Sequence, residues 1–436
     1  MRKKLVAIVM TAAMVTAVGG CGKKDNKENK ASNGNATEAP AATDDAAATE
    51  APAEVTDVAL KVWCPQNQVD TKIMEQQQQA FAEAHPEWNI TWTTEIVGED
   101  VCKTEVLKDV EAAGDVFFFA ADQLTELVDA GAIAQLGGSA EQMVKDTVAD
   151  SVRATVTIGD ATYGIPFTHN TFFMYYDKSL LDENDIKSLE GIMAKETADD
   201  VYNFYFQSAG GWQLGCYYYG AGCTVFGPEG NDLSVGCDWN NATGLAVTNY
   251  LIDLINNPKC AYDGEIAVSE LIGDHRLGAW FDGAWNYDMY HDVLKDDLGM
   301  AKIPTFNPDG TDHQLLSFYG SKAIGVNSHC KNMQVAVAFA EFLGNEENQL
   351  LRYQLSKQIP ANINASANEE IQADPLAAAL VQEANEASVM QPSCSTFSSR
   401  YWTYAGAIPT EIRSGETTKD NAQERLDKFV ENMIAE

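Results

Sequence analysis

The sequence has few basic residues, and beyond its first twenty positions it has no long apolar run. Its 436 residues include 29 Lys and Arg against 64 Asp and Glu, a formal net charge of −35. Nucleic-acid binding requires a basic face, and anionic lipid repels an acidic chain. We therefore expect neither a nucleic-acid partner nor electrostatic attachment to a membrane. At roughly 100–200 residues per domain, the length predicts two or more lobes.

The exception is the N-terminus, where three basic residues precede the 14-residue apolar run Leu5–Val18. A transmembrane helix needs about 20 such residues, so this pattern indicates a secretory signal peptide over residues 1–20. The run ends in Val18-Gly19-Gly20-Cys21, which resembles the bacterial lipobox and implies a lipid on Cys21. The alternative is ordinary cleavage and free secretion. With a lipid, the exported protein is held on the outer face of the cytoplasmic membrane.

Residues 21–56 contain no aromatic residue and no apolar periodicity. Such a segment buries too little surface to offset its ordering entropy, so we expect a disordered tether behind Cys21.

The chain also lacks the short motifs of common catalytic and metal sites. It has no Walker motif, GxSxG, HExxH, GxGxxG or CxxC, and no internal repeat. We expect no metal and no cofactor. The cysteines after Cys21 are compatible with free thiols, disulfides or, less simply, metal ligands, and Cys216 with Cys223 is the first pair to test. They are Cys64, Cys102, Cys216, Cys223, Cys237, Cys260, Cys330 and Cys394.

Alternating strand and helix patterns open the globular part and predict parallel βαβ units, hence an α/β lobe. Ligands of such sheets bind beyond the carboxyl ends of the strands, here Trp63–Gln68 and Phe119–Gln123. The last helix is indicated by Ala422, Leu426, Phe429 and Met433 on one face. The other expected elements are a strand at 58–64, a helix capped by Asp70 with Ile73, Gln77 and Phe81 on its apolar face, a strand at 90–97, a helix at 101–113 and a strand at 116–120.

Five stretches, in order, resemble the extracellular solute-binding proteins of carbohydrate ABC importers, in the class that includes maltose- and maltodextrin-binding proteins. The most specific is YGIP at 163–166 followed by YYDKSLL at 175–181. The others are Asp115–Leu136, Gly278–Trp285, Ser317–Ala361 with its KQIPA segment, and Tyr401–Gly415.

The resemblance implies a two-lobed α/β fold of the maltose-binding type, with three chain crossings between the lobes and a cleft that closes on the ligand. One lobe would hold residues 57–169 and 323–370, and the other residues 170–322 and 371–436. The liganded protein, which we expect to be a monomer, would dock on the permease subunits of an ABC transporter.

The residues at the matching positions suit a sugar, whose C–H faces stack on aromatic rings and whose hydroxyls need polar partners. The resemblance suggests Trp285, Trp402, Trp212, Phe119 and Trp63 as platforms, with core packing as the alternative for each. It suggests Asp122, Gln123, Asn170, Asn67 and Gln68 as hydroxyl partners. Asn170 can equally belong to a hinge loop and the last two to a solvated loop, and Gln123 stands where maltose binders often carry arginine.

These features predict a substrate-binding lipoprotein for maltose or malto-oligosaccharides and not an enzyme. Another neutral saccharide, such as a xylo-, fructo- or galacto-oligosaccharide, is the alternative within the class. A sugar sensor or adhesin on the same fold is a second alternative. A surface glycoside hydrolase is a third, and it would need two carboxylates about 5–9.5 Å apart around one bond.

Overall fold

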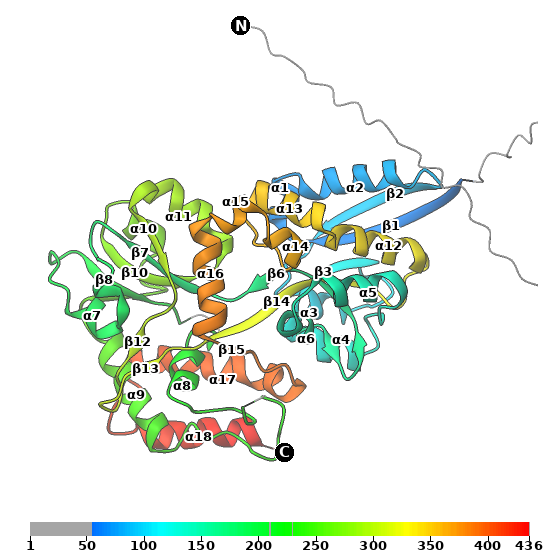
Figure 1. Cartoon of the computed structure of the whole chain (residues 1–436). Helices are drawn as coiled ribbons and strands as arrows, with labels where there is room; N and C mark the ends of the chain where they lie inside the picture. Colours follow the sequence, from blue (N-terminus) through cyan, green and yellow to red (C-terminus); the bar gives the residue numbers. More distant parts are fainter. Residues whose placement is uncertain (1–54, 209–210, 229, 436) are drawn as a thin grey trace, which may run out of the picture. The chain divides into compact units, whose positions relative to one another are not determined.

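The computed structural model describes residues 55–208, 211–228 and 230–435 (Figure 1). The predicted signal peptide, Cys21 and all but the last two positions of the predicted tether lie outside the described residues. Residues 53–436 form one compact unit. The predicted lobe ranges stay a prediction, and the fold is described below by its two main sheets.

The first sheet has six strands in the order β15-β14-β3-β1-β2, with β6 pairing on β14. Strand β1 pairs in parallel with both β2 and β3, whereas β14 runs antiparallel to β3 and β6. Buried side chains cover both faces, and every residue of β3 is buried, as expected for a central strand. Its strands are β1 (Thr56–Cys64), β2 (Trp88–Ile96), β3 (Val116–Ala120), β6 (Gly164–Asn170), β14 (Ser317–Val326) and β15 (Ser388–Met390).

The parallel βαβ arrangement predicted for the start of this sheet is confirmed, but two helix details are wrong. Asp70 does not cap the helix that follows β1. It ends a separate short helix, where Gln66 donates to its carboxylate, and the next helix begins at Ile73 after Lys72 in the left-handed conformation. The helix expected over 101–113 stops at Val106, because turns occupy the remainder up to Gly114.

The second sheet has five strands in the order β11-β7-β10-β8-β9. Strand β10 lies at its centre, parallel to β8 and antiparallel to β7, and all six of its residues are buried. Its strands are β7 (Phe173–Asp177), β8 (Tyr202–Phe206), β9 (Cys260–Tyr262), β10 (Leu277–Asp282) and β11 (Leu298–Ala301). Two hairpins pair β4 (Thr157–Ile158) with β5 (Ala161–Thr162) and β12 (Thr305–Phe306) with β13 (His313–Gln314).

Helices pack on both sheets. In the described part of the chain the first sheet is accompanied by α1 (Gln66–Asp70), α2 (Ile73–Ala84), α3 (Cys102–Val106), α4 (Leu124–Asp129), α5 (Gly138–Thr147), α6 (Asp150–Ala154), α12 (Met333–Gly344) and α13 (Glu346–Ser356). The rest are α7 (Leu189–Ala194), α8 (Gly215–Gly220), α9 (Ala242–Ile255), α10 (Val268–Ile272), α11 (Tyr287–Leu294), α14 (Ile363–Ser366), α15 (Glu369–Gln372), α16 (Pro375–Glu386), α17 (Ser395–Ser414) and α18 (Ala422–Ile434). The predicted last helix is confirmed, since all four marker residues of α18 are fully buried.

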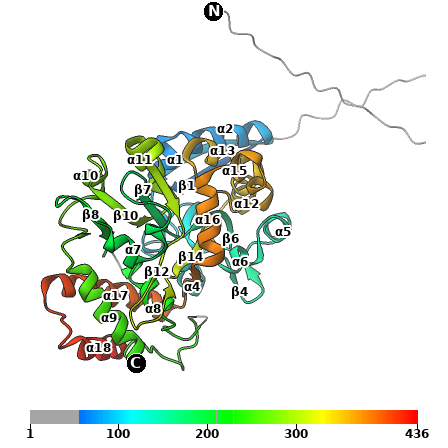
Figure 2. The same cartoon turned by 60° about the vertical axis from the view of Figure 1, so that its left-hand side comes forward.

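The chain passes between the sheets three times. It leaves the first sheet between β6 and β7, returns at β14, and runs along the second sheet again in α16 before β15 pairs with β14. Helices α9, α17 and α18 then lie together, as both views show (Figure 1, Figure 2). This is the α/β, two-sheet arrangement expected from the sequence.

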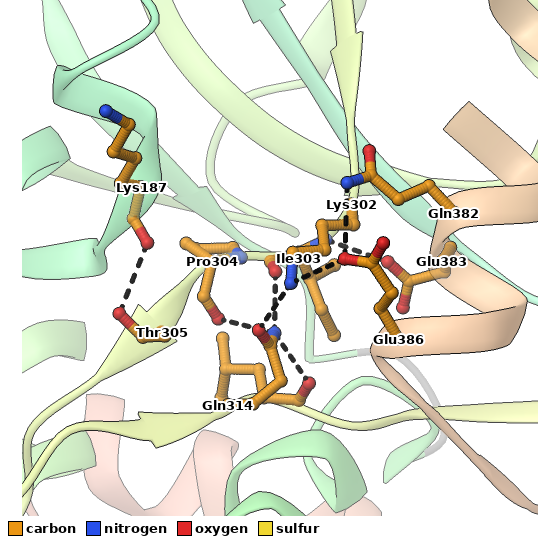
Figure 3. Close-up of polar contacts among 10 residues, drawn as sticks. Lys187, Lys302, Ile303, Pro304, Thr305, Gln314, Gln382, Glu383 and Glu386 are labelled. Atoms are coloured by element: carbon orange, nitrogen blue, oxygen red, sulfur yellow. Dashed lines mark hydrogen bonds and ion pairs between the residues drawn. The ribbon is translucent and has the colours of Figure 1, made fainter. Parts of the chain in front are cut away.

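Helix α16 is fastened to the segment between β11 and β13 by polar contacts (Figure 3). Glu383 accepts a hydrogen bond from the backbone of Ile303 at 2.8 Å, and Glu386 pairs with Lys302 at 3.1 Å. Gln314 accepts from Lys302 and donates to backbone carbonyls of the same segment. The third crossing is therefore anchored to the second sheet by side chains as well as by packing.

Within the described ranges, all eight cysteines are free thiols, so the pair Cys216 and Cys223 is not bridged. The same ranges contain no cluster of three or more His, Cys, Asp and Glu suited to a metal ion, and no helix long and apolar enough to cross a bilayer.

Candidate ligand-binding site

A cavity of about 590 Å³ lies between the two sheets, at the carboxyl end of β3 and next to the end of β10. Residues from both sheets and from α17 form its wall, and a smaller cavity of about 70 Å³ shares three of them. The wall consists of Glu99, Asp100, Ala120, Asp122, Gln123, Asn170, Trp212, Trp285, Lys322, Gln391 and Trp402.

Three indole rings line the cavity, and all three belong to residues that the resemblance suggested as platforms. Trp285 and Trp212 stack with ring centroids 5.8 Å apart, and Trp285 remains 38% exposed. The Trp212 Nε1–H donates to Gln391 Oε1 at 3.1 Å, which fixes the orientation of that ring. Trp402 projects from α17 and packs edge-on against Phe397. Trp212 and Trp285 thus come from segments that follow β8 and β10 of the second sheet, and Trp402 comes from α17, a helix far away in sequence.

The turn after β10 sets the position of Trp285. The buried Asp282 carboxylate accepts hydrogen bonds from Gly283 N at 2.7 Å, from Asn286 Nδ2 at 2.9 Å and from the Tyr290 hydroxyl. Burial raises the pKa of Asp282, and these hydrogen bonds oppose that rise. The Tyr175 hydroxyl also donates to the Gly283 carbonyl at 3.1 Å. One carboxylate therefore organises the turn that presents the ring.

Asp122 follows β3 in a short 3₁₀ turn and is partly exposed on the walls of both cavities. Burial raises the pKa of its carboxyl to about 6, while hydrogen bonding and the charge of Lys103 oppose the shift. An ionised carboxylate here can accept two or more hydroxyl donors. Asn170, which ends β6, borders the same two cavities and adds an amide.

Gln123 also lies on the wall, but its amide is occupied by the protein. Its Oε1 accepts from Lys103 N at 2.8 Å, and its Nε2 donates to the carbonyls of Glu99 at 2.8 Å and Asp100 at 2.7 Å. The side chain thus holds the loop before α3 against β3. That loop carries Glu99 and Asp100, so Gln123 shapes the wall through its neighbours.

Four residues predicted for the site are not on this wall. Phe119 is fully buried in the core beside Phe117, and Trp63 is 9% exposed with its Nε1–H donating to Glu95 at 2.7 Å. Asn67 is partly exposed but is not one of the lining residues. For Phe119 and Trp63 the structure favours the core-packing alternative.

Gln68 is the fourth of these residues, and it lies in the core because its amide binds the buried guanidinium of Arg352. Its amide accepts from Arg352 Nε at 3.3 Å and donates to Gln358 at 3.1 Å. Arg352 is 1% exposed, and burial lowers the pKa of its guanidinium to about 9. A buried guanidinium needs acceptors, so the amide of Gln68 is used inside the protein and not in the cavity.

Sequence reasoning missed four polar residues of the wall, namely Glu99, Asp100, Lys322 and Gln391. Lys322 lies within a stretch that carries the family resemblance, and a lysine in a strand of buried residues was a usable signal. Gln391 follows β15, and its place is set by tertiary contacts with Trp212 and with the backbone of Tyr319. The two acids come from the loop that Gln123 holds, a contact that the sequence does not indicate.

Three indoles and a set of amides and carboxylates, facing each other between two α/β sheets joined by three crossings, define a two-lobed binding protein. The sequence pattern of the bacterial extracellular solute-binding proteins matches residues 76–379. The chain therefore belongs to this family, whose members are exported.

Known proteins of this kind resemble the chain over most of its described length. One solved structure, described as a complex with acarbose, is 39% identical, superposes with a TM-score of 0.81 and covers 86% of this chain and 98% of its own. The galactooligosaccharide-binding protein of Bacillus subtilis is 23% identical over 73% of this chain and 77% of its own.

A maltooligosaccharide ABC transporter solute-binding lipoprotein of Streptococcus pneumoniae is 28% identical over 54% of this chain and 57% of its own. This match spans little more than half of that relative's length.

Proposed function

We propose that the protein is the substrate-binding lipoprotein of a carbohydrate ABC importer, and that it captures maltose or malto-oligosaccharides in the cavity between the sheets. The observation that supports this most directly is the wall itself, where three indole rings face carboxylates and amides across about 590 Å³. Stacked apolar faces and a polar rim are the two surfaces that a saccharide presents, so both find partners here.

Trp285, Trp402 and Trp212 are the proposed platforms, and Asp122 and Asn170 the proposed hydroxyl partners. Gln123 contributes by holding the loop of Glu99 and Asp100. The same-class alternative is a galacto-oligosaccharide, because the relative from Bacillus subtilis is named for that sugar. The pneumococcal relative and its name favour malto-oligosaccharides.

The proposal includes a lipid on Cys21, which would place the protein on the outer face of the cytoplasmic membrane. The name of the pneumococcal relative, a solute-binding lipoprotein of an ABC transporter, supports both this anchor and docking on permease subunits. Saccharide is bound and released unchanged in this role, so we expect no hydrolysis.

Titration of the protein without residues 1–20 with maltotriose, followed by calorimetry and tryptophan fluorescence, tests the proposal. We expect saturable binding at micromolar concentrations with a change in fluorescence, because three indoles line the cavity. Galactotriose titrated in parallel decides between the two sugars. Absence of heat and of any fluorescence change with every malto-oligosaccharide would contradict the maltodextrin assignment, and release of shorter sugars would indicate an enzyme.

Single substitutions then test the platforms. Trp285→Ala and Trp402→Ala should each weaken binding about tenfold or more without unfolding, since an aromatic ring buries about 150–250 Å². Trp63→Phe is the matched control, because Trp63 lies in the core and off the wall. Normal binding by both alanine variants would show that the platforms are elsewhere.

A further inference from the structure

Lys322 has an unusual place on the cavity wall. Among the described residues of the wall it is the one cation, and it shares the wall with three carboxylates, those of Glu99, Asp100 and Asp122. It lies in β14 directly opposite Ala120, at the position where the pairing of β14 with β6 shifts register. Such irregularities bend a strand and redirect a side chain. The register shift thus accompanies a lysine that lines the cavity from a strand of buried residues.

The Lys322 ammonium lies between a carboxylate and an indole ring. Its Nζ is 3.6 Å from Glu99 Oε1 and 4.9 Å from the centroid of the Trp285 ring. Hydrogen bonds between ammonium and carboxylate groups are typically about 2.7–2.9 Å long, so the contact with Glu99 is an ion pair without a formed hydrogen bond. The lysine contacts the ring at a distance typical of a cation–π pair.

Glu99 has an unused acceptor at this point. The residue is 8% exposed, and its Oε1 is buried without a hydrogen-bond partner. A carboxylate oxygen left in this condition is costly, so its occupation by a donor is favourable. The buried acceptor of Glu99 and the ammonium of Lys322, which lies at the Trp285 ring, are together complementary to one hydroxyl group.

We propose that Lys322 and Glu99 together recognise one hydroxyl group of the sugar ring that stacks on Trp285. The hydroxyl accepts a hydrogen bond from Lys322 Nζ and donates its own to Glu99 Oε1. This inference rests on the proposed saccharide-binding function and adds the feature of the sugar that the site selects.

The pair is selective because donor and acceptor are both charged and both held in place. An epimer directs the hydroxyl elsewhere and a deoxy analogue lacks it, so either ligand leaves Glu99 Oε1 buried without a donor. Sites built to bind a hydroxyl reject analogues that lack it far more strongly than apolar pockets reject a changed methylene. Lys322 and Glu99 are therefore specificity-determining residues. We expect weaker selectivity for the sugar rings that stack on Trp212 and Trp402.

The test compares the wild-type protein with Lys322→Met, titrated calorimetrically with maltotriose and with each of its monodeoxy analogues. We expect the wild type to bind one analogue of the panel about tenfold or more weakly than maltotriose. Lys322→Met should bind maltotriose about tenfold more weakly than wild type, and should no longer distinguish it from that one analogue. Glu99→Gln should lose discrimination at the same position, because the amide group replaces the ionised acceptor.

Lys145→Met is the matched control, since Lys145 pairs with Glu141 at 2.6 Å and does not line the cavity. It should retain the affinity and the discrimination of the wild type. Unchanged binding by Lys322→Met, tighter binding, or equal weakening for every analogue would overturn the inference while leaving saccharide binding intact. Failure of the wild type to bind any saccharide would overturn the proposed function, and this inference with it.

Discussion

Gly283 determines where the Trp285 ring can lie. A Cβ atom built on Gly283 would be 2.1–2.4 Å from three atoms of the ring, a separation that no side chain tolerates. The φ of Gly283 is −89°, so the glycine is needed for space and not for a left-handed backbone. The indole packs directly on the backbone of the turn that Asp282 organises.

Gly283→Ala should therefore displace the Trp285 ring and weaken saccharide binding about tenfold or more, through loss of the stacking area. Calorimetric titration with maltotriose measures the effect, and a melting curve shows whether the fold is retained. Gly137→Ala is the control, because a Cβ there meets nothing within 4 Å and its φ is −148°. Equal affinities for the two variants would contradict the role of Gly283.

The pKa of Asp122, raised to about 6 by burial, predicts a pH dependence of binding. Hydroxyl donors favour the ionised carboxylate, so protonation competes with the ligand and affinity falls as the pH drops through 6. Between pH 7.5 and pH 5 the ionised fraction, and with it the affinity, should fall about tenfold. Asp122→Asn should bind more weakly but show a flatter profile over this range. A variant profile as steep as that of the wild type would assign the dependence to another group.

Among single residues, the sequence indicated as site candidates those that lie directly after a strand or on a distinctive motif, such as Asp122 and Trp285, and the structure places both on the cavity wall. It did not predict the hydrogen-bond partners of the Gln123 and Gln68 side-chain amides. Gln68 serves Arg352, which is 284 positions away in sequence, and Gln123 bonds to the backbone of a loop. Both choices depend on tertiary contacts that no local pattern records, and the same holds for Glu99 as a wall residue.

Among the elements, α16 carries a fully buried acid at the third crossing. Glu383 is 0% exposed, accepts from Ile303 N and has Oε1 without a hydrogen-bond partner. Burial raises the pKa of Glu383 to about 8 from a usual value of 4.5, and Ser317 and Lys302 oppose the shift only in part. Burial raises the pKa of the Cys216 thiol well above its usual value, and the charge of the same carboxylate adds to the rise.

Protein stability should therefore fall as the pH rises towards 8. The folded state keeps a proton on Glu383 up to about pH 8, whereas the unfolded state loses it near pH 4.5, so deprotonation favours unfolding between these values. The window from pH 7 to 8 lies above the pKa of Asp122, about 6, and above that of His169, which is about 4 in the folded state and 6.5 without burial. Melting temperatures should decline across it in the wild type and much less in Glu383→Gln.

Glu386→Gln provides the comparison for this measurement, because Glu386 is exposed and lies in the same helix. Its contact with Lys302 is drawn in Figure 3. Its carboxyl has a lowered pKa, caused by hydrogen bonds from Lys302 and Gln382. This variant should keep the decline of the wild type. A decline that survives in Glu383→Gln would assign the proton to another group.

The sequence predicted those elements whose periodicity follows burial, such as β3 and α18. It failed at the Asp70 cap and at the end of α3. In both places local turn hydrogen bonds, such as Gln66 to Asp70 and Ala112 to Asp109, replace the helix that the pattern indicated. Side-chain bonds of this kind compete with helix formation and are weak signals in a sequence.

In the whole molecule, the three crossings meet at one buried point. Ser317, at the start of β14, bonds to the Thr171 hydroxyl at 2.9 Å and donates its backbone N–H to Ala387 O at 2.8 Å. Thr171 belongs to the first crossing and Ala387 to the third. Three segments linked at one point restrict how the two sheets can move relative to each other, as expected of a hinge that closes around a ligand.

The eight free cysteines have a consequence for how this protein is made. A member of an exported family usually meets an oxidising environment, yet none of the described cysteines is paired. Burial raises the pKa of most of these thiols, to about 12 for Cys64, Cys223 and Cys260, so little reactive thiolate is present at neutral pH. The melting temperature should therefore be the same with and without a reducing agent, and a decrease on reduction would reveal a cross-link. A fold without disulfide bonds requires no oxidase or isomerase for maturation, so the globular part can be produced in a reducing cytoplasm with its native structure.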